Sequence, residues 1–272
     1  MTGDRRHHAM LKVGAAIVLV MAVAAIAGPV FTPFDPAQQA LALRLAPPSW
    51  GHPFGLDELG RDILARVLAG ARISFFVAVV VVTVSALVGT LLGAVAGYFG
   101  GLLDEVIGRV TDTLLAFPGL LLAIALVAVL GPSLGNVLFA LGISGWVGYA
   151  RLVRGQVLRA REFEYVQAAR ALGAPHSRVL LRHLVPTALP AVCVQATLGL
   201  AGAILGEAAL SFLGLGVQPP TPSWGTMLSG GRAHLLDAPH LTLFPGLGIA
   251  LLVLGFNLVG DGLRDLTDPK HR

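Results

Sequence analysis

Long apolar stretches alternate with shorter polar ones along this chain of 272 residues. A helix needs about 20 apolar residues to cross the hydrocarbon core of a bilayer. Stretches of that length occur at about 10–31, 73–97, 110–131, 134–153, 190–213 and 241–260. Apolar residues run consecutively in these stretches instead of alternating every second residue, which excludes the strands of a membrane barrel. The pattern predicts an all-α membrane protein with six transmembrane helices.

The longest interruption on the predicted inner side, residues 155–189, lies between the fourth and fifth apolar stretches, and we name it the polar loop. Apolar positions recur at helical spacing in its first half, at Val166, Ala169 and Leu172. Gly173 and Pro175 follow, and these residue types end helices. A second pattern sets three apolar residues against three basic ones: Val179, Leu180 and Leu184 against Arg178, Arg182 and His183. Because Pro186 is expected to stop this pattern, the loop is predicted to be a helix, a turn and a second helix.

Two other polar segments, 32–72 and 214–240, follow the first and the fifth apolar stretches. The first of them opens with proline-rich turn sequences. From Asp57 to Arg72, apolar residues fall on one side and charged residues on the other. This predicts an amphipathic helix that lies on the membrane surface, with its Arg and Asp side chains solvated and paired with one another.

Hydrophobic residues make up 55% of the chain and charged residues only 12%, about half of the roughly 25% usual in soluble domains. The net charge of +4 reflects the distribution of arginine rather than a nucleic-acid site. With the N-terminus inside, only five of the 19 Lys and Arg residues lie on the outer side: Arg44, Arg61, Arg66, Arg72 and Arg232. Since cytoplasmic loops carry the excess of basic residues, both termini and the polar loop are expected in the cytoplasm. The expected surroundings are membrane lipid, and no nucleic acid.

The first apolar stretch has two interpretations. Three basic residues precede a run that ends in Ala25-Ile26-Ala27, which is also typical of a secretory signal peptide. We favour a retained helix. Cleavage would instead leave five spans and a new N-terminus outside.

Two features inside the spans are candidate functional elements. Gly89, Gly93 and Gly97 recur every four residues, which predicts a smooth strip for helix packing; a substrate path beside this strip is the alternative. Glu207 is an ionisable residue within the fifth span. Such a residue is costly in a membrane unless it faces protein or water, so it either lines or gates a translocation path, or makes a structural hydrogen bond with Ser211 or a neighbouring helix.

Known catalytic motifs are lacking in the sequence. A phosphate-binding loop needs a Lys beside its glycines, and the only two lysines are Lys12 and Lys270. There is also no serine elbow, no HExxH zinc motif and no His pair at ligand spacing inside a span. The single cysteine, Cys193, has no partner for a disulfide within the chain. We therefore expect no catalytic residue, no metal site, no cofactor and no ATP hydrolysis by this chain.

The polar loop resembles the EAA loop of permease subunits in bacterial ABC importers, which contacts the ATPase. The matching residues are Ala168, Ala169, Gly173 and Pro186, with Gln167 where Glu is usual. Other segments, in order, are similar to the C-type permease subunit of dipeptide, oligopeptide and nickel ABC importers. Among them are HPFGLDELGRDILARVLAGARIS, EAALSFLGLGVQPPTPSWGTML and NLVGDGLRDLTDP.

The resemblance implies a type I ABC importer transmembrane fold in the bacterial cytoplasmic (inner) membrane, carrying peptides or related small solutes. A permease for nickel complexes and a secondary transporter are the alternatives. The implied partners are a homologous B-type permease subunit, two ABC ATPase subunits and an extracytoplasmic solute-binding protein. The expected ATPase-coupling residues are Gln167, Ala168, Ala169, Gly173, Arg178, Arg182 and Pro186.

The expected organisation has three parts. Residues 1–72 hold the N-terminal transmembrane helix and the outer amphipathic segment. Residues 73–265 form the importer core, which includes the polar loop, and residues 266–272 form a cytoplasmic tail.

Overall fold

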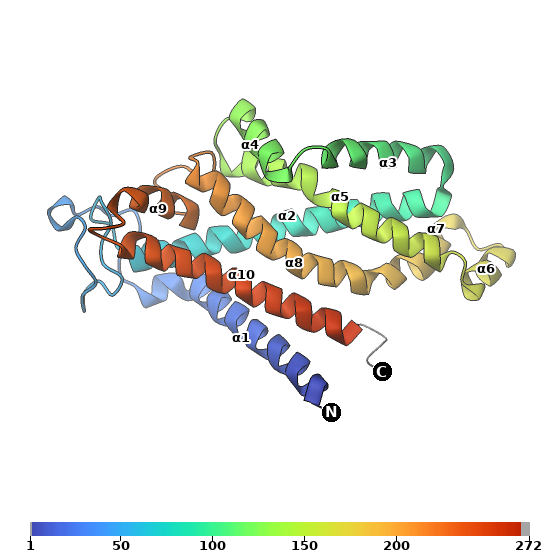
Figure 1. Ribbon diagram of the computed structural model, residues 1–272, viewed down its shortest axis with the longest axis horizontal. Coiled ribbons are helices and arrows are strands. Elements are labelled where there is room, and N and C mark those ends of the chain that lie inside the picture. Colours follow the sequence, from blue (N-terminus) through green and yellow to red (C-terminus); the bar gives the residue numbers. More distant parts are fainter. Residues whose placement is uncertain (1, 268–272) are drawn as a thin grey trace.

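The computed structural model describes residues 2–267, of which 2–8, 29–31 and 267 are described as backbone only. All regular elements in that range are helical (Figure 1). The long helices are α1 (Thr2–Phe31), α2 (Ile63–Phe99), α5 (Leu134–Ala160), α8 (Val185–Phe212) and α10 (His240–Thr267). The shorter ones are α3 (Gly101–Leu115), α4 (Gly119–Leu130), α6 (Glu164–Ala171), α7 (His176–Arg178) and α9 (Trp224–Gly231). Single turns of 3₁₀-helix lie at Leu41–Leu43 and Arg232–His234, and a π-helical turn at Val179–Leu184.

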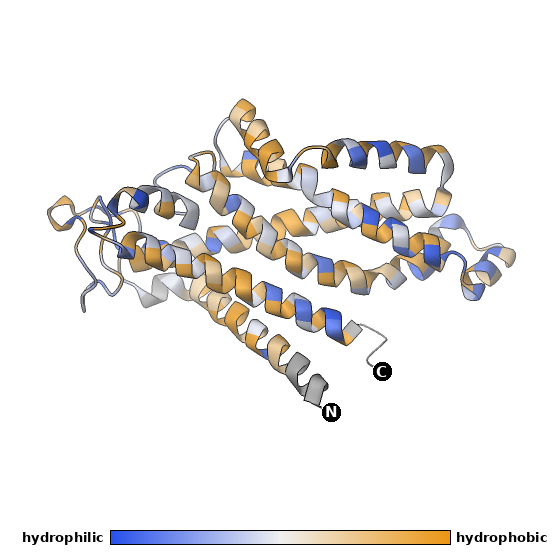
Figure 2. Ribbon diagram, in the orientation of Figure 1, coloured by the Kyte–Doolittle hydropathy of each residue, from blue (hydrophilic) through white to orange (hydrophobic). Residues whose placement is uncertain are grey.

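Five continuous helical segments are long and apolar enough to cross a membrane, and α3 with α4 makes a sixth candidate that is bent by 84°. The prediction of a helical, multi-span chain is confirmed. The expected third span, 110–131, is divided between α3 and α4 and is not one continuous helix. The break lies at Pro118, which stands at the N-cap of α4. A proline has no N–H and disfavours helical geometry in the residue before it, so one helix ends and another begins there. Figure 2 shows that α4 is apolar throughout, while α3 carries polar residues along its length.

The expected surface helix over 57–72 is also wrong. The second long helix begins at Ile63 and continues unbroken through Arg72 to Phe99. Its start is fixed by Asp62, whose side chain accepts a hydrogen bond from the backbone N–H of the third residue on, as an N-cap does. The expected boundary between residues 72 and 73 therefore falls inside α2.

The charged residues near this helix start are paired, as expected, but they are not solvated. Arg66 is only 5% exposed, and its Nε lies 3.4 Å from a carboxylate oxygen of the buried Asp57. Arg61 also pairs with Asp57, at 2.7 Å. Because this carboxylate joins two guanidinium groups, it ties the turn that precedes α2 to the helix itself.

Pro186 does not stop the second helix of the polar loop, contrary to the prediction. The segment His176–Phe212 is one helical span, in which the π-helical turn Val179–Leu184 stands just before the proline. In that turn the N–H of Val185 bonds to the carbonyl of Leu180, five residues back. A proline inside an α-helix clashes with the carbonyl four residues earlier, and the wider π turn displaces that carbonyl.

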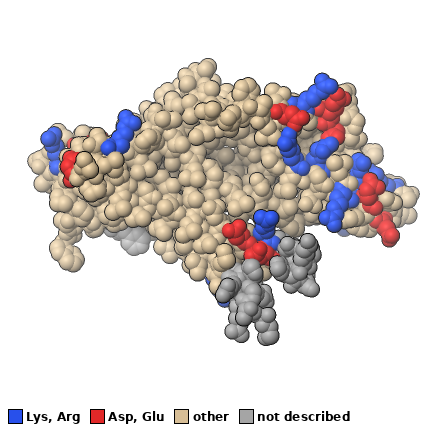
Figure 3. Space-filling view, in the orientation of Figure 1, with Lys and Arg blue, Asp and Glu red and all other residues tan. Residues whose placement is uncertain are grey.

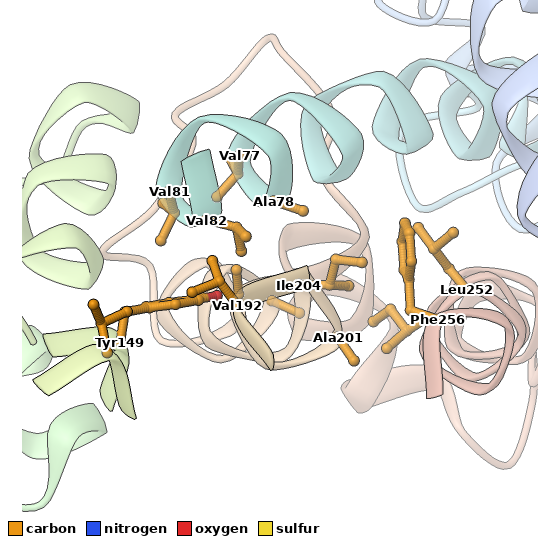
Figure 4. Packing of buried hydrophobic residues seen from close by; sticks show 14 of the residues in the cluster. Val77, Ala78, Val81, Val82, Tyr149, Val192, Ala201, Ile204, Leu252 and Phe256 are labelled. Atoms are coloured by element: carbon orange, nitrogen blue, oxygen red, sulfur yellow. The ribbon is translucent and has the colours of Figure 1, made fainter. Parts of the chain in front are cut away.

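The centre of the molecule is the contact of α2 with α5 and α8. A Cβ at Gly93 would lie 2.3 Å from the carbonyl oxygen of Ala150 in α5. Gly89 and Gly97 meet other backbone carbonyls of α5, at 2.5 and 2.9 Å from their would-be Cβ atoms. The three glycines therefore let the α2 and α5 backbones touch. Valines of α2 fill the space toward α8, and Leu252 and Phe256 of α10 close the far side (Figure 4).

Charged side chains on the visible face gather at the left end, at the right end and, in a smaller group, at the lower edge near the C-terminal end of α10 (Figure 3). An uncharged belt lies between the left end and the other two groups. The polar loop lies at the more densely charged end, on the right in Figures 1 and 3. The belt matches the hydrocarbon core of a bilayer, where an isolated charge is costly.

The glycine strip generates the first prediction. Gly93→Ala should lower the free energy of unfolding by about 1–3 kcal/mol or more, because the new methyl group collides with backbone rather than with a movable side chain. Gly155→Ala is the matched control, since its Cβ meets nothing within 4 Å and alanine is the better helix former. Thermal unfolding of the purified protein measures both. Equal midpoints for the two variants would show that α2 and α5 do not touch along this strip.

Candidate functional site

The polar loop begins with the C-terminal part of α5 and continues through α6, a tight turn and α7 into the π-helical turn. The turn between α6 and α7 is a Schellman motif. The N–H of Gly173 bonds to the carbonyl of Arg170 at 2.9 Å, and the N–H of Ala174 bonds to that of Ala169 at 3.0 Å. Gly173 has φ +80, a conformation that side chains with a Cβ rarely adopt. The predicted helix, turn and helix are confirmed up to this point of the loop.

The inner face of the loop is fixed to the end of α2. Val166 and Val179 are fully buried. Tyr98, in the last turn of α2, bonds through its hydroxyl to Nδ1 of His176 at 2.7 Å. The guanidinium of Arg170 lies 4.7 Å from the centre of the same ring, a distance typical of a cation–π contact. One aromatic residue therefore holds both the helix before the turn and the helix after it.

The outer face of the loop carries the residues that the sequence singles out. Gln167, Ala168, Gly173, Arg178, Arg182 and Pro186 are exposed, and Ala169 is half-buried. Leu172 is 88% exposed at the tip of the turn. Gln167 bonds through its side-chain amide to the carbonyl of Glu162, at 3.2 Å. The face thus combines small residues, one projecting leucine and guanidinium groups, which suits contact with another protein.

Tyr98 and His176 are absent from the set of residues selected from the sequence. The available signal was weak: an aromatic residue at the end of an apolar span is typical of the membrane interface. Nothing in the spacing of residues 78 positions apart indicates that these two meet.

Two ion pairs join α3 to α5 near the same end of the molecule. Asp104 pairs with Arg154, with one contact at 2.7 Å, and Asp112 pairs with Arg151. The distribution of basic residues along the chain places Arg151 and Arg154 on the inner side, but nothing in the sequence connects them with α3. The pairs fix a helix whose other face is exposed.

Glu207 lies in α8 and is 0% exposed. Ser211, one turn later, donates a hydrogen bond to its Oε1 at 2.7 Å, as the sequence spacing suggests. The same serine oxygen accepts the N–H of Val217 at 3.3 Å. Among residues 2–267, Oε2 of Glu207 has no hydrogen-bond partner, although the hydroxyls of Ser74 and Ser223 face this carboxyl group.

The surroundings of Glu207 form a closed joint between α2, α8 and α9. Trp224, at the start of α9, is fully buried and donates its indole N–H to the carbonyl of Val67 in α2, at 3.0 Å. A Cβ at Gly225 would lie 2.2 Å from the carbonyl of Ala208, so α9 rests directly on α8. The carboxyl group can therefore act as a hydrogen-bond acceptor in this joint. Within the single chain it reaches no surface, and the described residues contain no His, Cys, Asp and Glu group arranged to hold a metal.

Comparison with known proteins adds an independent observation. Residues 89–272 match the family described as binding-protein-dependent transport system inner membrane component. Residues 6–48 match the N-terminal TM domain of oligopeptide transport permease C. Both the polar loop and Glu207 lie inside the larger match.

Several curated proteins are similar over nearly the whole chain. The dipeptide transport system permease protein DppC of Alkalihalophilus pseudofirmus is 48% identical over 260 residues, which is 96% of this chain and 86% of that protein. The oligopeptide transport system permease protein OppC of Bacillus subtilis is 44% identical over 267 residues, covering 98% of this chain and 88% of its own length. The glutathione transport system permease protein GsiD of Escherichia coli is 47% identical over the same number of residues, with the same coverage.

The buried carboxyl group generates the second prediction. Glu207→Gln should preserve both assembly and transport, because the amide keeps the shape and an acceptor for Ser211. Ser211→Ala should lower the free energy of unfolding by about 1–3 kcal/mol, because it leaves Oε1 of Glu207 and the N–H of Val217 unpaired in a buried site. Yield of folded protein and solute uptake measure the two effects. A Gln variant that assembles normally but loses uptake would contradict the structural role and favour a role in the path.

Proposed function

Because the chain belongs to the family of binding-protein-dependent transport system inner membrane components, we propose that it forms half of the translocation path of an ATP-driven importer of type I fold. The chain is a multi-pass inner-membrane permease. The observation that carries the proposed coupling role is the polar loop. It projects from the end of the bundle, is braced on its inner face by Tyr98 and exposes Ala168, Gly173 and Leu172 on its outer face.

The exposed face of the loop is the proposed docking site for an ABC ATPase subunit. Small residues at Ala168, Ala169 and Gly173 permit close approach, and the exposed Leu172 supplies an apolar anchor. Arg178 and Arg182 stand beside it as polar contacts at the rim. Gln167 is uncharged and bonds back to the loop, so an ionic contact is not expected from that position.

Movement of the ATPase would reach the membrane through rigid connections. Tyr98 links the loop to α2 through His176, and Arg161 donates to the carbonyl of Gly97 at 3.3 Å. The π-helical turn joins the loop to α8 without a break. ATP-driven closure would therefore tilt α2 and α8 together, provided that the ATPase contacts the loop differently in its two states.

The proposed partners follow from the family and from the loop. ATP hydrolysis would come from two ATPase subunits, since the chain has no phosphate-binding Lys loop. A homologous B-type permease subunit would complete the path, and an extracytoplasmic solute-binding protein would deliver the solute.

Peptides or related small solutes are the proposed substrate class. The similar proteins are named for the transport of dipeptides, oligopeptides and glutathione, which favours peptides over nickel complexes. A secondary transporter is disfavoured, because such proteins place ion-binding groups in matched halves and Glu207 is enclosed in a packed joint.

Both termini are proposed to be cytoplasmic, with α1 retained as a membrane helix. Most Lys and Arg residues lie on the side of the polar loop under this orientation. Close contacts support retention of α1: a Cβ at Gly14 would meet the carbonyl of Gly255 in α10 at 2.8 Å, and one at Gly262 would meet Leu11 at 2.7 Å. A helix packed this closely behaves as part of the bundle.

The coupling role generates the third prediction. Gly173→Leu should leave the protein in the membrane but abolish uptake and weaken co-purification of the ATPase. Leucine at φ +80 stores about 1–2 kcal/mol of backbone strain and adds bulk to the docking face. Gly214→Leu is the matched control, because Gly214 has φ +79 and open space around its Cβ but lies outside the loop. Normal uptake by the Gly173 variant, or equal losses in both variants, would show that the loop is not the coupling element.

The orientation generates the fourth prediction. After replacement of the exposed Cys193, single cysteines at Ser177, Gly51 and Ser229 are treated with a membrane-impermeant thiol reagent in intact cells. Positions 51 and 229 should react, and position 177 should react only after permeabilisation. Gly51 is chosen over the neighbouring Gly55, whose φ of +77 and tight surroundings would not accept a side chain. Labelling at position 177 in intact cells would reverse the orientation.

A further inference from the structure

Arg72 occupies an unusual position in the groove between α1 and α2. Its Nε–H donates to the carbonyl of Ala25, and an Nη2–H donates to the carbonyl of Ile26 at 2.6 Å. Pro29 has no N–H, so the carbonyl of Ala25, four residues earlier, lacks its helical donor. Arg72 supplies that missing donor from the neighbouring helix.

The guanidinium group of Arg72 has hydrogen-bond donors that are not used within the described part of the chain. It has five N–H donors, and only the two bonds to α1 are made within the described part of the chain. No carboxylate among residues 9–28 and 32–266 forms an ion pair with it, and its side chain is exposed. A fork of donors with a full positive charge is therefore open to an anion.

Two hollows meet at Arg72. One, of about 370 Å³, lies deeper along the helices and is lined otherwise by Ala22, Ala25, Ile26 and Phe75, all of them apolar. The other, of about 450 Å³, lies toward the helix ends, where Gly28, Thr32 and Asp35 contribute to its lining. The arrangement is amphipathic: an apolar trough, a guanidinium at its mouth and a carboxylate beyond it.

Arg72 lies at the level along the helices where the hydrocarbon core of the bilayer is expected to end. The apolar window of α1 ends at Gly28, within one turn of the carbonyls that Arg72 binds. On α2, 37 residues span about 55 Å at 1.5 Å each, well beyond the roughly 30 Å of hydrocarbon. The outermost turns of α2 therefore rise above the apolar core, and Arg72 stands at the level of lipid phosphates.

We propose that this groove is a binding site for an amine-bearing phospholipid such as phosphatidylethanolamine. The phosphate binds the free donors of Arg72, one acyl chain lies in the trough beside Ala22 and Ile26, and the ammonium group pairs with Asp35. The Asp35 side chain is held at the rim, since its Oδ1 accepts the N–H of Ala37 at 2.8 Å, and the residue is exposed. The site rests on the proposed orientation only in that the lipid would belong to the outer leaflet.

The test uses the assembled transporter in nanodiscs that contain phosphatidylethanolamine, phosphatidylcholine and phosphatidylglycerol in equal amounts. Native mass spectrometry counts the lipids that remain bound to the complex after it is released from the nanodisc. The unmodified complex should retain phosphatidylethanolamine in preference to the other two lipids. Arg72→Gln should weaken that retention on the order of tenfold, as expected for the loss of a charge-assisted pair. Asp35→Asn should keep a bound phospholipid but lose the preference for the amine headgroup.

Two further variants keep the test decisive. Ala22→Phe fills the apolar trough without changing any charge, so retention should fall even where Arg72 and its contacts to α1 are intact. Arg44→Gln removes another exposed outer arginine that lines neither hollow, and retention should be unchanged. Thermal midpoints confirm that each variant is folded.

Equal retention by the Arg72→Gln and Arg44→Gln complexes would overturn the proposal. So would the absence of any retained lipid, which would mean that a partner subunit covers the groove. Unchanged retention by Ala22→Phe would reduce the site to a phosphate contact without an acyl chain, and would also overturn it. Because the readout is a lipid count rather than uptake, its outcome is independent of whether the polar loop couples to an ATPase.

Discussion

The close contact between the backbones of α2 and α5 determines where most of the other elements lie. In a membrane, helices gain little from burying apolar side chains and associate mainly through tight packing. Gly93 meets the carbonyl of Ala150 with no room for a methyl group. This contact fixes α2 as the central axis. Its outer part carries the contacts to α1 and α9, its middle packs on α8, and its last turn holds the polar loop through Tyr98.

Local patterns in the sequence predicted the parts of the structure that depend on local physics. Apolar length indicated the spans, and the four-residue repeat of glycine indicated a packing strip. The spacing of Glu207 and Ser211 offered their hydrogen bond as one of the interpretations of Glu207, and that bond is present. The turn at Gly173 was likewise predicted, because glycine is the residue that tolerates a positive φ. Each of these features is decided by residues within one or two helical turns.

The features that sequence reasoning missed depend on packing between distant segments. Amphipathicity over 57–72 suggested a surface helix, but burial of Arg66 against Asp57 shows that tertiary pairing decides where these charges lie. Pro186 was expected to end a helix, and the π-helical turn before it relieves the clash instead. The contacts of Tyr98 with His176 and of Arg72 with Ala25 join residues far apart in the chain. No periodicity in a single sequence indicates such pairs.

The helices differ in how tightly they pack, and this difference separates the elements suited to transmit force from those suited to move. α2 runs for 37 residues without a break, touches α5 through backbone and is tied to the polar loop at one end and to the Glu207 joint at the other. α3 and α4 are instead bent by 84° at Pro118 and leave many apolar side chains exposed. They are held to α5 partly by the pairs Asp104–Arg154 and Asp112–Arg151, and paired charges near a surface exchange partners more readily than interlocked backbones separate. In the proposed importer, α2 therefore acts as the lever, and α3 with α4 is the part of the chain that can shift against a partner subunit as the lever tilts.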